Sequence, residues 1–323
     1  MINYVIIFLV SFIITLGFTY MLIPRLKRFR IVGKDVNKPD KPEVAEMGGI
    51  AIVAGFVGGV LLAVFLNSFF SFQFNLINIL AAIITILAIA IIGLVDDLLD
   101  LPQWFKALLP LGAAIPLIAV NAVESTSMLF PFIGQIDFGI FYPFVLIPIG
   151  IAVASNLTNM FAGFNGLESG LGIVMFSTIL VISIMHGNTE MSVLSVPILG
   201  ALFAFLIFNW YPARAFPGDV GNLSIGAILA STVIIGNFET AGALLLIPFV
   251  IDFFIKAYNK FPSKNWWGEY KNGKLYPVDN KVRGFAQLVM KRFDGIREKN
   301  LTLFFIGIEM VVGVIVLILF ARY

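Results

Sequence analysis

The sequence has no cysteine and a single histidine, His186, among its 323 residues. The absence of cysteine excludes disulfides, iron–sulfur clusters and thiol nucleophiles. Charged side chains are also scarce, at 12% against about 25% in a typical soluble protein, whereas hydrophobic residues make up 59%. So few charges cannot cover a globule of this size, which predicts a protein whose solvent is lipid. A net charge of only +2 argues against nucleic-acid binding.

Ten apolar stretches approach or exceed the length of about 20 residues that a helix needs to cross a bilayer. We therefore predict an all-α, polytopic membrane protein with about ten transmembrane helices, folded as a single domain over residues 1–323. Two of the stretches are short, which indicates tilt or partial burial. The predicted spans are 3–23, 49–68, 76–95, 105–120, 141–158, 168–185, 193–209, 222–236, 240–257 and 301–320.

Nearly all the positive charge lies in loops that ten spans would place on one side of the membrane. These loops are at about 24–48, 96–105, 156–167, 210–221 and 258–300. With Lys106 and Lys256 at their edges, they hold 20 of the 21 Lys and Arg residues, and Arg322 is the exception. Because basic loops stay in the cytosol, we expect a multi-pass cell-membrane protein with a cytosolic active face and external termini. Contact with anionic membrane lipids explains part of this charge.

The third predicted span ends on a pair of adjacent acids, Asp96 and Asp97. Adjacent carboxylates repel each other and need water, a cation or a basic partner nearby. Lys106, at the start of the next span, is a candidate partner. An acidic, solvated helix end explains the pair equally well.

Amides follow the fifth predicted span. Asn156 and Asn159 are three residues apart and share a helix face, and Asn165 follows among glycines. Amide oxygens are neutral ligands for a hard cation, and amides also bind sugar or base edges. A turn with a polar cap is the structural alternative.

Asp219 precedes the eighth predicted span in the segment Arg214-Ala-Phe216-Pro-Gly-Asp219. A helix start flanked by glycine favours phosphate, and a carboxylate beside it suits Mg²⁺. A lone Asp before a helix is more often a simple N-cap. Taken together, however, the acids, amides and lone basic residues converge on one membrane face, which favours Mg²⁺-assisted chemistry on a phosphate compound. His186 lies in an external loop, so a histidine base is not expected at this face.

In this order, the motifs resemble the polyprenyl-phosphate N-acetylhexosamine-1-phosphate transferase family, glycosyltransferase family 4. The resemblance covers most of the chain, from the first cytosolic loop to the tenth span. It is closest to the dolichyl branch, because Asn-Trp-Tyr-Pro and Ala-Gly-Phe-Asn-Gly-Leu-Glu are similar to the eukaryotic GlcNAc enzyme, and the loop Pro-Ser-Lys-Asn-Trp-Trp-Gly-Glu-Tyr resembles an archaeal one. Asn165, where lipid I synthase has Asp, and the absence of histidine from 256–300 argue against a muramoyl-pentapeptide substrate. The signatures are Gly-Leu-Val-Asp96-Asp97-Leu-Leu-Asp-Leu with Lys106, Asn159 with Ala-Gly-Phe-Asn165-Gly-Leu-Glu168, and Asn-Trp-Tyr-Pro-Ala-Arg214 with Phe216-Pro-Gly-Asp219.

The resemblance implies transfer of GlcNAc-1-phosphate from UDP-GlcNAc to a polyprenyl, dolichyl-type phosphate, with release of UMP. Another UDP-N-acetylhexosamine is the alternative donor. Mg²⁺, replaceable by Mn²⁺, is the implied cofactor, and Asp219 and Asn159 match its ligands. The implied partners are both substrates and membrane lipids, while the oligomeric state, a homodimer included, stays open.

Further roles also follow from the resemblance alone. Lys106 matches a lysine on the phosphates, and Asp96 and Asp97 match paired acids that orient it or admit the lipid phosphate; with Asp219 they form the expected catalytic set. The expected substrate contacts are Asn165 and Phe216 at the uridine, Glu46 in the first loop, Arg214, and Lys264 and Arg283 as basic sugar- and pyrophosphate-binding residues.

A secondary transporter is the alternative from a different class, because polar groups and broken helices in a membrane suit one as well. Transporter sites usually lie near the middle of the bilayer, however, and these polar clusters lie at span ends. The sequence therefore favours the enzyme.

Overall fold

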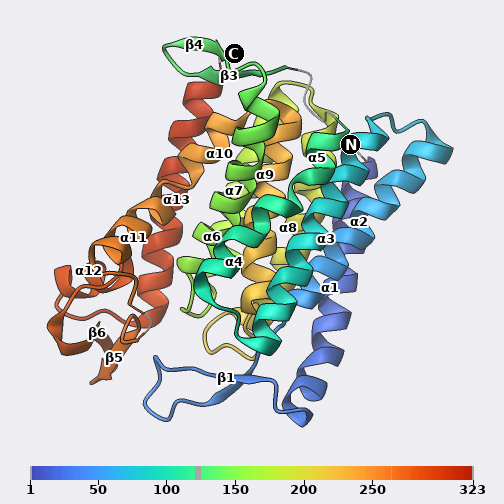
Figure 1. Ribbon diagram of the computed structural model, residues 1–323. Coiled ribbons are helices and arrows are strands. Elements are labelled where there is room, and N and C mark those ends of the chain that lie inside the picture. Colours follow the sequence, from blue (N-terminus) through green and yellow to red (C-terminus); the bar gives the residue numbers. More distant parts are fainter. Residues whose placement is uncertain (1, 121–124, 263, 322–323) are drawn as a thin grey trace.

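The computed structural model describes residues 2–120, 125–262 and 264–321, so Arg322 lies outside the described residues. The described chain is a bundle of long helices with short hairpins at its two ends (Figure 1). The α-helices are α1 (Ile2–Arg28), α2 (Gly49–Phe70), α3 (Leu76–Leu99), α4 (Gln103–Ala113), α5 (Ile115–Ala119), α6 (Ile147–Met160), α7 (Leu167–Met185), α8 (Thr189–Asn209), α9 (Gly218–Gly236), α10 (Glu239–Leu245), α11 (Ile247–Tyr258), α12 (Phe285–Arg292) and α13 (Glu298–Phe320). A π-helical turn (Tyr142–Leu146) precedes α6, and a 3₁₀ turn (Val278–Asn280) precedes α12.

All ten predicted spans are helical, which confirms an all-α polytopic membrane protein. Within the described residues, eight helices are long and apolar enough to cross a membrane. The pair α10 and α11, bent by 57°, makes a ninth if it is one span. The remaining predicted span is the shorter apolar helix Gln103–Ala119, which breaks between α4 and α5.

Among the residues that the structure describes, the loops contain three two-stranded antiparallel hairpins that the sequence did not predict. They pair β1 (Val32–Lys34) with β2 (Glu43–Ala45), β3 (Ser127–Phe130) with β4 (Gly134–Asp137), and β5 (Gly268–Lys271) with β6 (Lys274–Pro277). The last hairpin turns on Asn272 and Gly273, which both have positive φ, as a two-residue hairpin turn requires. These hairpins shape the ends of the bundle without altering its helical core.

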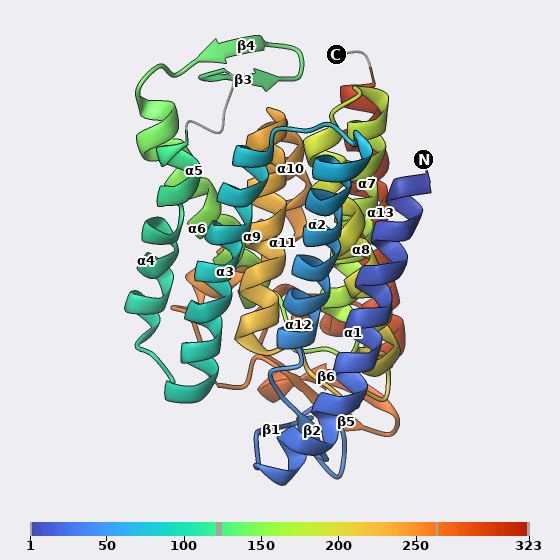
Figure 2. The ribbon, with the colours of Figure 1, turned by 90° about the vertical axis from the view of Figure 1, so that its right-hand side faces the viewer.

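Helix α9 lies at the centre of the bundle, where it contacts α2, α3, α6, α7 and α8 (Figures 1 and 2). The contact with α3 depends on Gly93, because a Cβ there would lie 2.6 Å from the backbone of Val220. The contact with α2 depends on Gly49 and Gly221, whose backbones meet directly. These close approaches hold the first turn of α9 against the ends of its neighbours.

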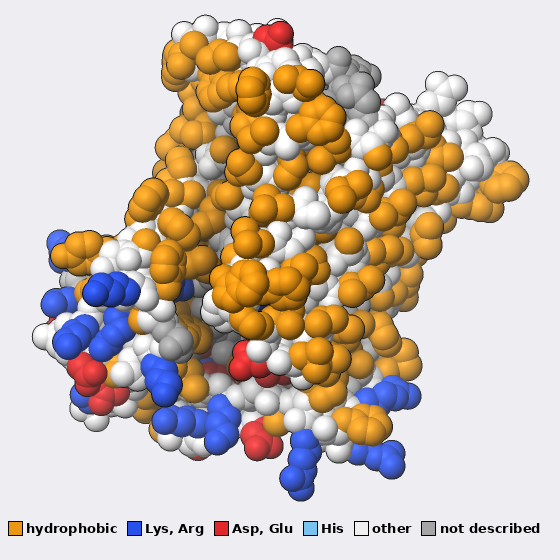
Figure 3. All heavy atoms as spheres, in the orientation of Figure 1, with side chains coloured by type: hydrophobic (Ala, Val, Ile, Leu, Met, Phe, Trp, Pro, Cys, Tyr) orange, Lys and Arg blue, Asp and Glu red, His pale blue; other side chains and the backbone are white. Residues whose placement is uncertain are grey.

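The two ends of the bundle differ in charge. Helix α1 begins and α13 ends at the same end, where His186 Nε2 lies 2.9 Å from the carbonyl oxygen of Phe320. The opposite end carries most of the visible Lys and Arg side chains, below a hydrophobic middle (Figure 3). That basic end contains the predicted cytosolic loops and also the short helix α12.

Candidate functional site

Side chains from four helices meet around Lys106 at the basic end of the bundle. The Lys106 ammonium in α4 lies 2.5 Å from Asp96 Oδ2 in α3 and also forms an ion pair with Asp219 Oδ2 in α9. With its oxygen turned toward Lys106, the Asn159 amide in α6 accepts from Nζ at 2.9 Å and donates to Asp219 Oδ1 at 2.9 Å. Lys106 and Asp96 are each only 8% exposed. The structure thus brings four predicted site residues together in one partly buried cluster.

A tight turn between α3 and α4 places Asp96 beside Lys106. Asp100 ends α3 in the left-handed conformation, and Pro102 is the N-cap residue just before α4. The backbone N–H of Leu101 donates to Asp96 Oδ1 at 2.9 Å, so this carboxylate holds the turn while its other oxygen contacts Lys106. The proline suits a helix start because its missing N–H needs no partner there.

Asp97 has a different role from its neighbour. Its two carboxylate oxygens accept from the backbone N–H groups of Asp219, at 2.8 Å, and Val220, at 3.0 Å. Asp97 therefore caps the N-terminus of α9, where a negative charge is favoured. The sequence predicted that the N–H groups at the start of α9 would bind phosphate. This is wrong for those of Asp219 and Val220, because both already donate to Asp97. The two adjacent acids therefore have separate roles. Asp96 forms an ion pair with Lys106, and Asp97 caps α9, the helix that carries Asp219.

The loops that carry Glu46 and Phe216 pair with each other through the backbone. The Phe216 N–H donates to the Ala45 carbonyl at 2.8 Å, and the Gly48 N–H donates back to the Phe216 carbonyl at 2.8 Å. Burial, and then the negative charge of Asp97, raises the pKa of Glu46. The pairing thus holds together the two loops that carry the predicted substrate contacts Glu46 and Phe216.

Asn165 is 2% exposed and its amide is already engaged within the protein. Its Oδ1 accepts from the Ala213 N–H at 2.8 Å, and its Nδ2 donates to Asp35 Oδ2 at 3.1 Å. Its own backbone N–H donates to Glu298 Oε1 at 3.0 Å. Asn165 therefore fixes the loop that leads to Phe216.

A buried ion-pair network that the sequence does not predict adjoins Asn165. The Lys38 ammonium lies 2.9 Å from Asp35 Oδ2, forms an ion pair with Glu298, and sits 4.6 Å from the centre of the Tyr211 ring. Asp35 is 3% exposed and Glu298 is 5% exposed. No local signal marks them, because Lys38 looks like one of many loop cations and Glu298 like an ordinary charge at a helix start.

The last long loop packs over this network. The Trp266 ring covers Gly163, where an added Cβ would clash with it, and Asn37 bridges the Gly163 carbonyl and the Gly268 N–H at 2.9 Å each. The Arg283 guanidinium stabilises the same loop, because its Nη1 donates a hydrogen bond to the Val278 carbonyl at 3.0 Å. Arg283 thus supports the loop rather than reaching the Lys106 cluster.

Two other predicted contacts lie apart from the Lys106 cluster. Lys264 is exposed on the last loop. Arg214 faces α8, where its Nη2 donates to the Ile207 carbonyl at 3.1 Å and its guanidinium carbon lies 4.9 Å from the centre of the Phe208 ring. The structure therefore does not bring Lys264 or Arg214 into contact with Lys106.

The oxygens of Asp219 and Asn159 suit a Mg²⁺ ion shared with a substrate. Turning the Asn159 amide over would place its oxygen, instead of its nitrogen, 2.9 Å from Asp219 Oδ1. Mg²⁺ commonly takes one or two protein ligands and completes its shell with water and substrate phosphates. Within the described ranges, no group of three or more His, Cys, Asp or Glu residues is placed to hold a metal alone. The residues fit a metal that also needs substrate ligands.

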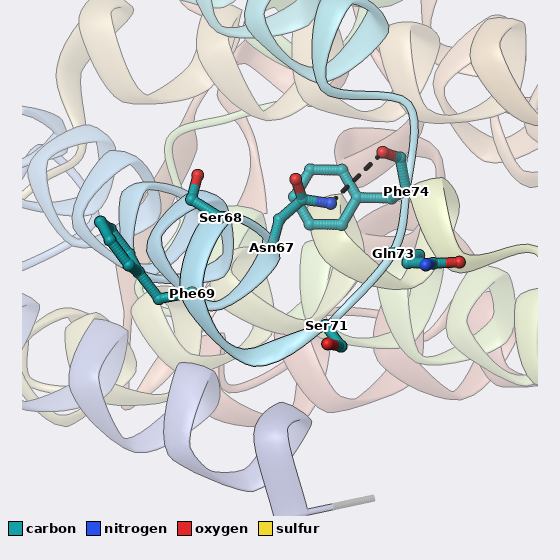
Figure 4. A pocket seen from close by; sticks show the side chains of 6 residues that line it. All are labelled: Asn67, Ser68, Phe69, Ser71, Gln73 and Phe74. Carbon is teal, nitrogen blue, oxygen red and sulfur yellow. Dashed lines mark hydrogen bonds between the residues drawn. The ribbon is translucent and has the colours of Figure 1, made fainter.

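A hollow of about 650 Å³ at the opposite end of the bundle is unrelated to the cluster. It lies at the turn between α2 and α3, where Asn67 Nδ2 donates to the Phe72 carbonyl at 2.8 Å and to the Phe74 carbonyl at 3.4 Å. Figure 4 shows the lining residues and the second of these bonds. Its lining side chains carry no charge. This hollow is explained by the turn itself.

Comparisons with known proteins place this geometry in context. A family model described as glycosyl transferase family 4 matches residues 79–237. A protein of Saccharolobus solfataricus, provisionally named a UDP-N-acetylglucosamine–dolichyl-phosphate N-acetylglucosaminephosphotransferase, is 39% identical over 96% of this chain and 95% of its own length. A Sulfolobus acidocaldarius protein with the same provisional name is 34% identical over 96% and 94%. The Dictyostelium discoideum enzyme of that name is 28% identical over 73% and 68%.

Proposed function

The chain belongs to glycosyl transferase family 4, and we propose that it transfers GlcNAc-1-phosphate from UDP-GlcNAc to a dolichyl-type polyprenyl phosphate, releasing UMP. The names of the relatives support these substrates. The observation that carries the proposal is Lys106 held between Asp96 and Asp219, next to Asn159, at a span end. A soluble nucleotide sugar and a membrane-bound phosphate can both reach such a position.

In the proposed reaction, an oxygen of the lipid phosphate forms a bond to the β-phosphorus of UDP-GlcNAc. The bond from that phosphorus to the bridging oxygen breaks, and UMP leaves with the electron pair. The lipid phosphate is already anionic at neutral pH, so the harder task is to bring two anions together. Lys106 neutralises part of that charge, while Asp96 orients its ammonium group.

We assign Asp219 and Asn159 as Mg²⁺ ligands, with Mn²⁺ as a substitute. The bound metal would neutralise diphosphate charge and orient the donor. Binding of Mn²⁺, measured by electron paramagnetic resonance in the presence of UDP, tests this assignment independently of turnover. Asn159→Ala and Asp219→Ala should each weaken binding at least tenfold, whereas Asn156→Ala, one turn away on the same helix, should not. Equal binding in all three variants would contradict the assignment.

The nucleotide is proposed to lie between the paired loops. Phe216 stacks on the uracil ring, Glu46 lies beside it, and Asn165 acts by holding the Ala213 backbone. In this arrangement Asn165→Ala raises the KM for UDP-GlcNAc through the loop. Asn165→Asp would place a charge next to Asp35 and should be at least as damaging.

The basic end is proposed to face the cytosol, as the charge distribution favours. The chain has no cysteine, so single cysteines can report the side without further engineering. In intact cells, a membrane-impermeant maleimide should label Ser68→Cys at the α2–α3 turn and spare Lys34→Cys in the first loop. The opposite pattern would reverse the orientation.

The proposed activity is tested with purified protein, polyprenyl phosphate, Mg²⁺ and a panel of radiolabelled UDP-sugars. The expected result is a lipid-linked product and UMP with UDP-GlcNAc, and neither after chelation of the metal. A product from only a different UDP-N-acetylhexosamine would correct the sugar. The absence of product from every donor would overturn the transferase and reopen the transporter alternative.

A further inference from the structure

A groove of about 610 Å³ lies at the basic end of α1, outside the proposed active site. The last turns of α1 form one wall, and the end of α8 with the loop after it forms the other. Figure 2 shows α1 and α4, which carries Lys106, on opposite flanks of the bundle. The groove is lined chiefly by Tyr20, Met21, Arg25, Arg28, Phe208 and Arg214. None of these residues takes part in the Lys106 cluster.

Three guanidinium groups line the groove without an acidic partner. Arg25 Nη1 donates to the Met21 carbonyl at 2.7 Å, and Arg214 Nη2 donates to the Ile207 carbonyl at 3.1 Å. In the part of the chain that the structure describes, no carboxylate forms an ion pair with Arg25, Arg28 or Arg214. A guanidinium has five N–H donors in a geometry that matches phosphate. Most of those donors are therefore available to an anion.

An apolar seam continues from these arginines toward the middle of the bundle. The rings of Phe8 in α1 and Phe203 in α8 lie 6.1 Å apart, so the two helices are in contact there. Phe203 and Ile207 on α8 are 41% and 51% exposed, and Tyr20 on α1 is 74% exposed. In a membrane these side chains face hydrocarbon, so an acyl or isoprenoid tail has an apolar surface next to the basic groove.

We propose that this groove binds the phosphate headgroup of an anionic membrane phospholipid, with a tail along the seam between α1 and α8. The combination of unpaired arginines and an adjacent apolar seam suits a lipid better than free phosphate, which would gain nothing from the seam. The polyprenyl phosphate acceptor has the same headgroup chemistry. We assign the groove to bulk phospholipid because Arg214 faces α8 and α1 rather than Lys106.

The proposal is tested with full-length protein in nanodiscs of phosphatidylcholine and phosphatidylglycerol, followed by native mass spectrometry of retained lipid. Wild-type protein should retain phosphatidylglycerol in preference to phosphatidylcholine. The double variant Arg25→Gln/Arg28→Gln should lose at least fivefold of that preference, and Arg28→Gln alone should lose part of it. The matched control Lys27→Gln/Arg30→Gln removes the same charge from the same segment outside the groove, and should stay within twofold of wild type.

Three outcomes would overturn the proposal. Wild-type protein could show no preference for phosphatidylglycerol. The control variant could lose as much as the groove variant, which would mean that the general positive potential of this end is responsible. Equimolar polyprenyl phosphate could displace the retained phosphatidylglycerol from wild-type protein, which would assign the groove to the acceptor. These readouts do not depend on turnover, so they remain informative if the proposed transferase activity fails its own test.

Discussion

Asp97→Asn separates the positioning of α9 from the chemistry at Lys106. Both oxygens of Asp97 accept backbone N–H groups at the start of α9, at 2.8 and 3.0 Å. Asparagine keeps one acceptor and turns an NH₂ group toward the other N–H, so one charge-assisted bond is lost and one is weakened. From the cost of losing such a cap and bond, we expect the free energy of unfolding to fall by about 2 kcal/mol.

Turnover of Asp97→Asn should fall by about tenfold to a hundredfold, because a small displacement of α9 moves Asp219 relative to Lys106. Melting temperature in detergent and initial rate of UMP release measure the two effects. Asp100→Asn is the matched control, since Asp100 is exposed three residues later and ends α3 in a left-handed conformation that asparagine also adopts. Wild-type stability with a loss of activity beyond a thousandfold would refute the capping role and place Asp97 in the chemistry itself.

Three further predictions concern other parts of the bundle. Gly93→Ala should lower the free energy of unfolding by about 1–3 kcal/mol and also lower turnover, because the added Cβ would meet the α9 backbone. Gly112→Ala is the control and should be neutral, because the space around its Cβ is open. Equal melting temperatures of the two variants would contradict this prediction. Both carboxylate oxygens of the buried Glu309 lack a partner among the described residues, so Glu309→Leu should raise the melting temperature, and a lower one would argue for a hidden role. Burial and the charge of Asp97 raise the pKa of Glu46 above its usual 4.5, so its ionisation opposes folding. Wild-type stability should therefore fall relative to Glu46→Gln as the pH rises from 4.5 through the raised pKa, and parallel melting curves at all pH values would refute that.

The sequence predicted the helices well because hydrophobic length in a membrane is a strong and local signal. It also predicted the meeting of Asp96, Lys106, Asn159 and Asp219, since all four stand at span ends on the same side. Only the short length of the predicted span at 105–120 indicated the break between α4 and α5.

The separate roles of Asp96 and Asp97 could not be read from their adjacency. Neighbours on a helix point about 100° apart, so two adjacent acids reach different partners. Which acid reaches Lys106 and which caps α9 depends on how α3 packs against α9 at Gly93.

The network around Lys38 was equally hidden from sequence reasoning. Lys38 and Glu298 are separated by 260 residues, and their pairing depends on how the first loop folds against the start of α13. A charge that is buried only in the folded bundle looks like any other loop charge in the sequence.

The role of Lys106 is tested most directly by the turnover of Lys106→Ala with UDP-GlcNAc, polyprenyl phosphate and Mg²⁺, on protein that elutes as a single species of wild-type size. Lys256→Ala is the comparison, because Lys256 is also a partly buried lysine paired with an acid, Asp252, at 2.7 Å, but lies outside the cluster. Removing one preorganised hydrogen-bond donor from an oxyanion-binding site typically costs a factor of about 10²–10³ in rate, and Lys106 would supply such a donor together with its charge. We expect a loss of at least that size for Lys106→Ala and a much smaller loss for Lys256→Ala. Near-normal turnover of folded Lys106→Ala would contradict the role assigned to Lys106.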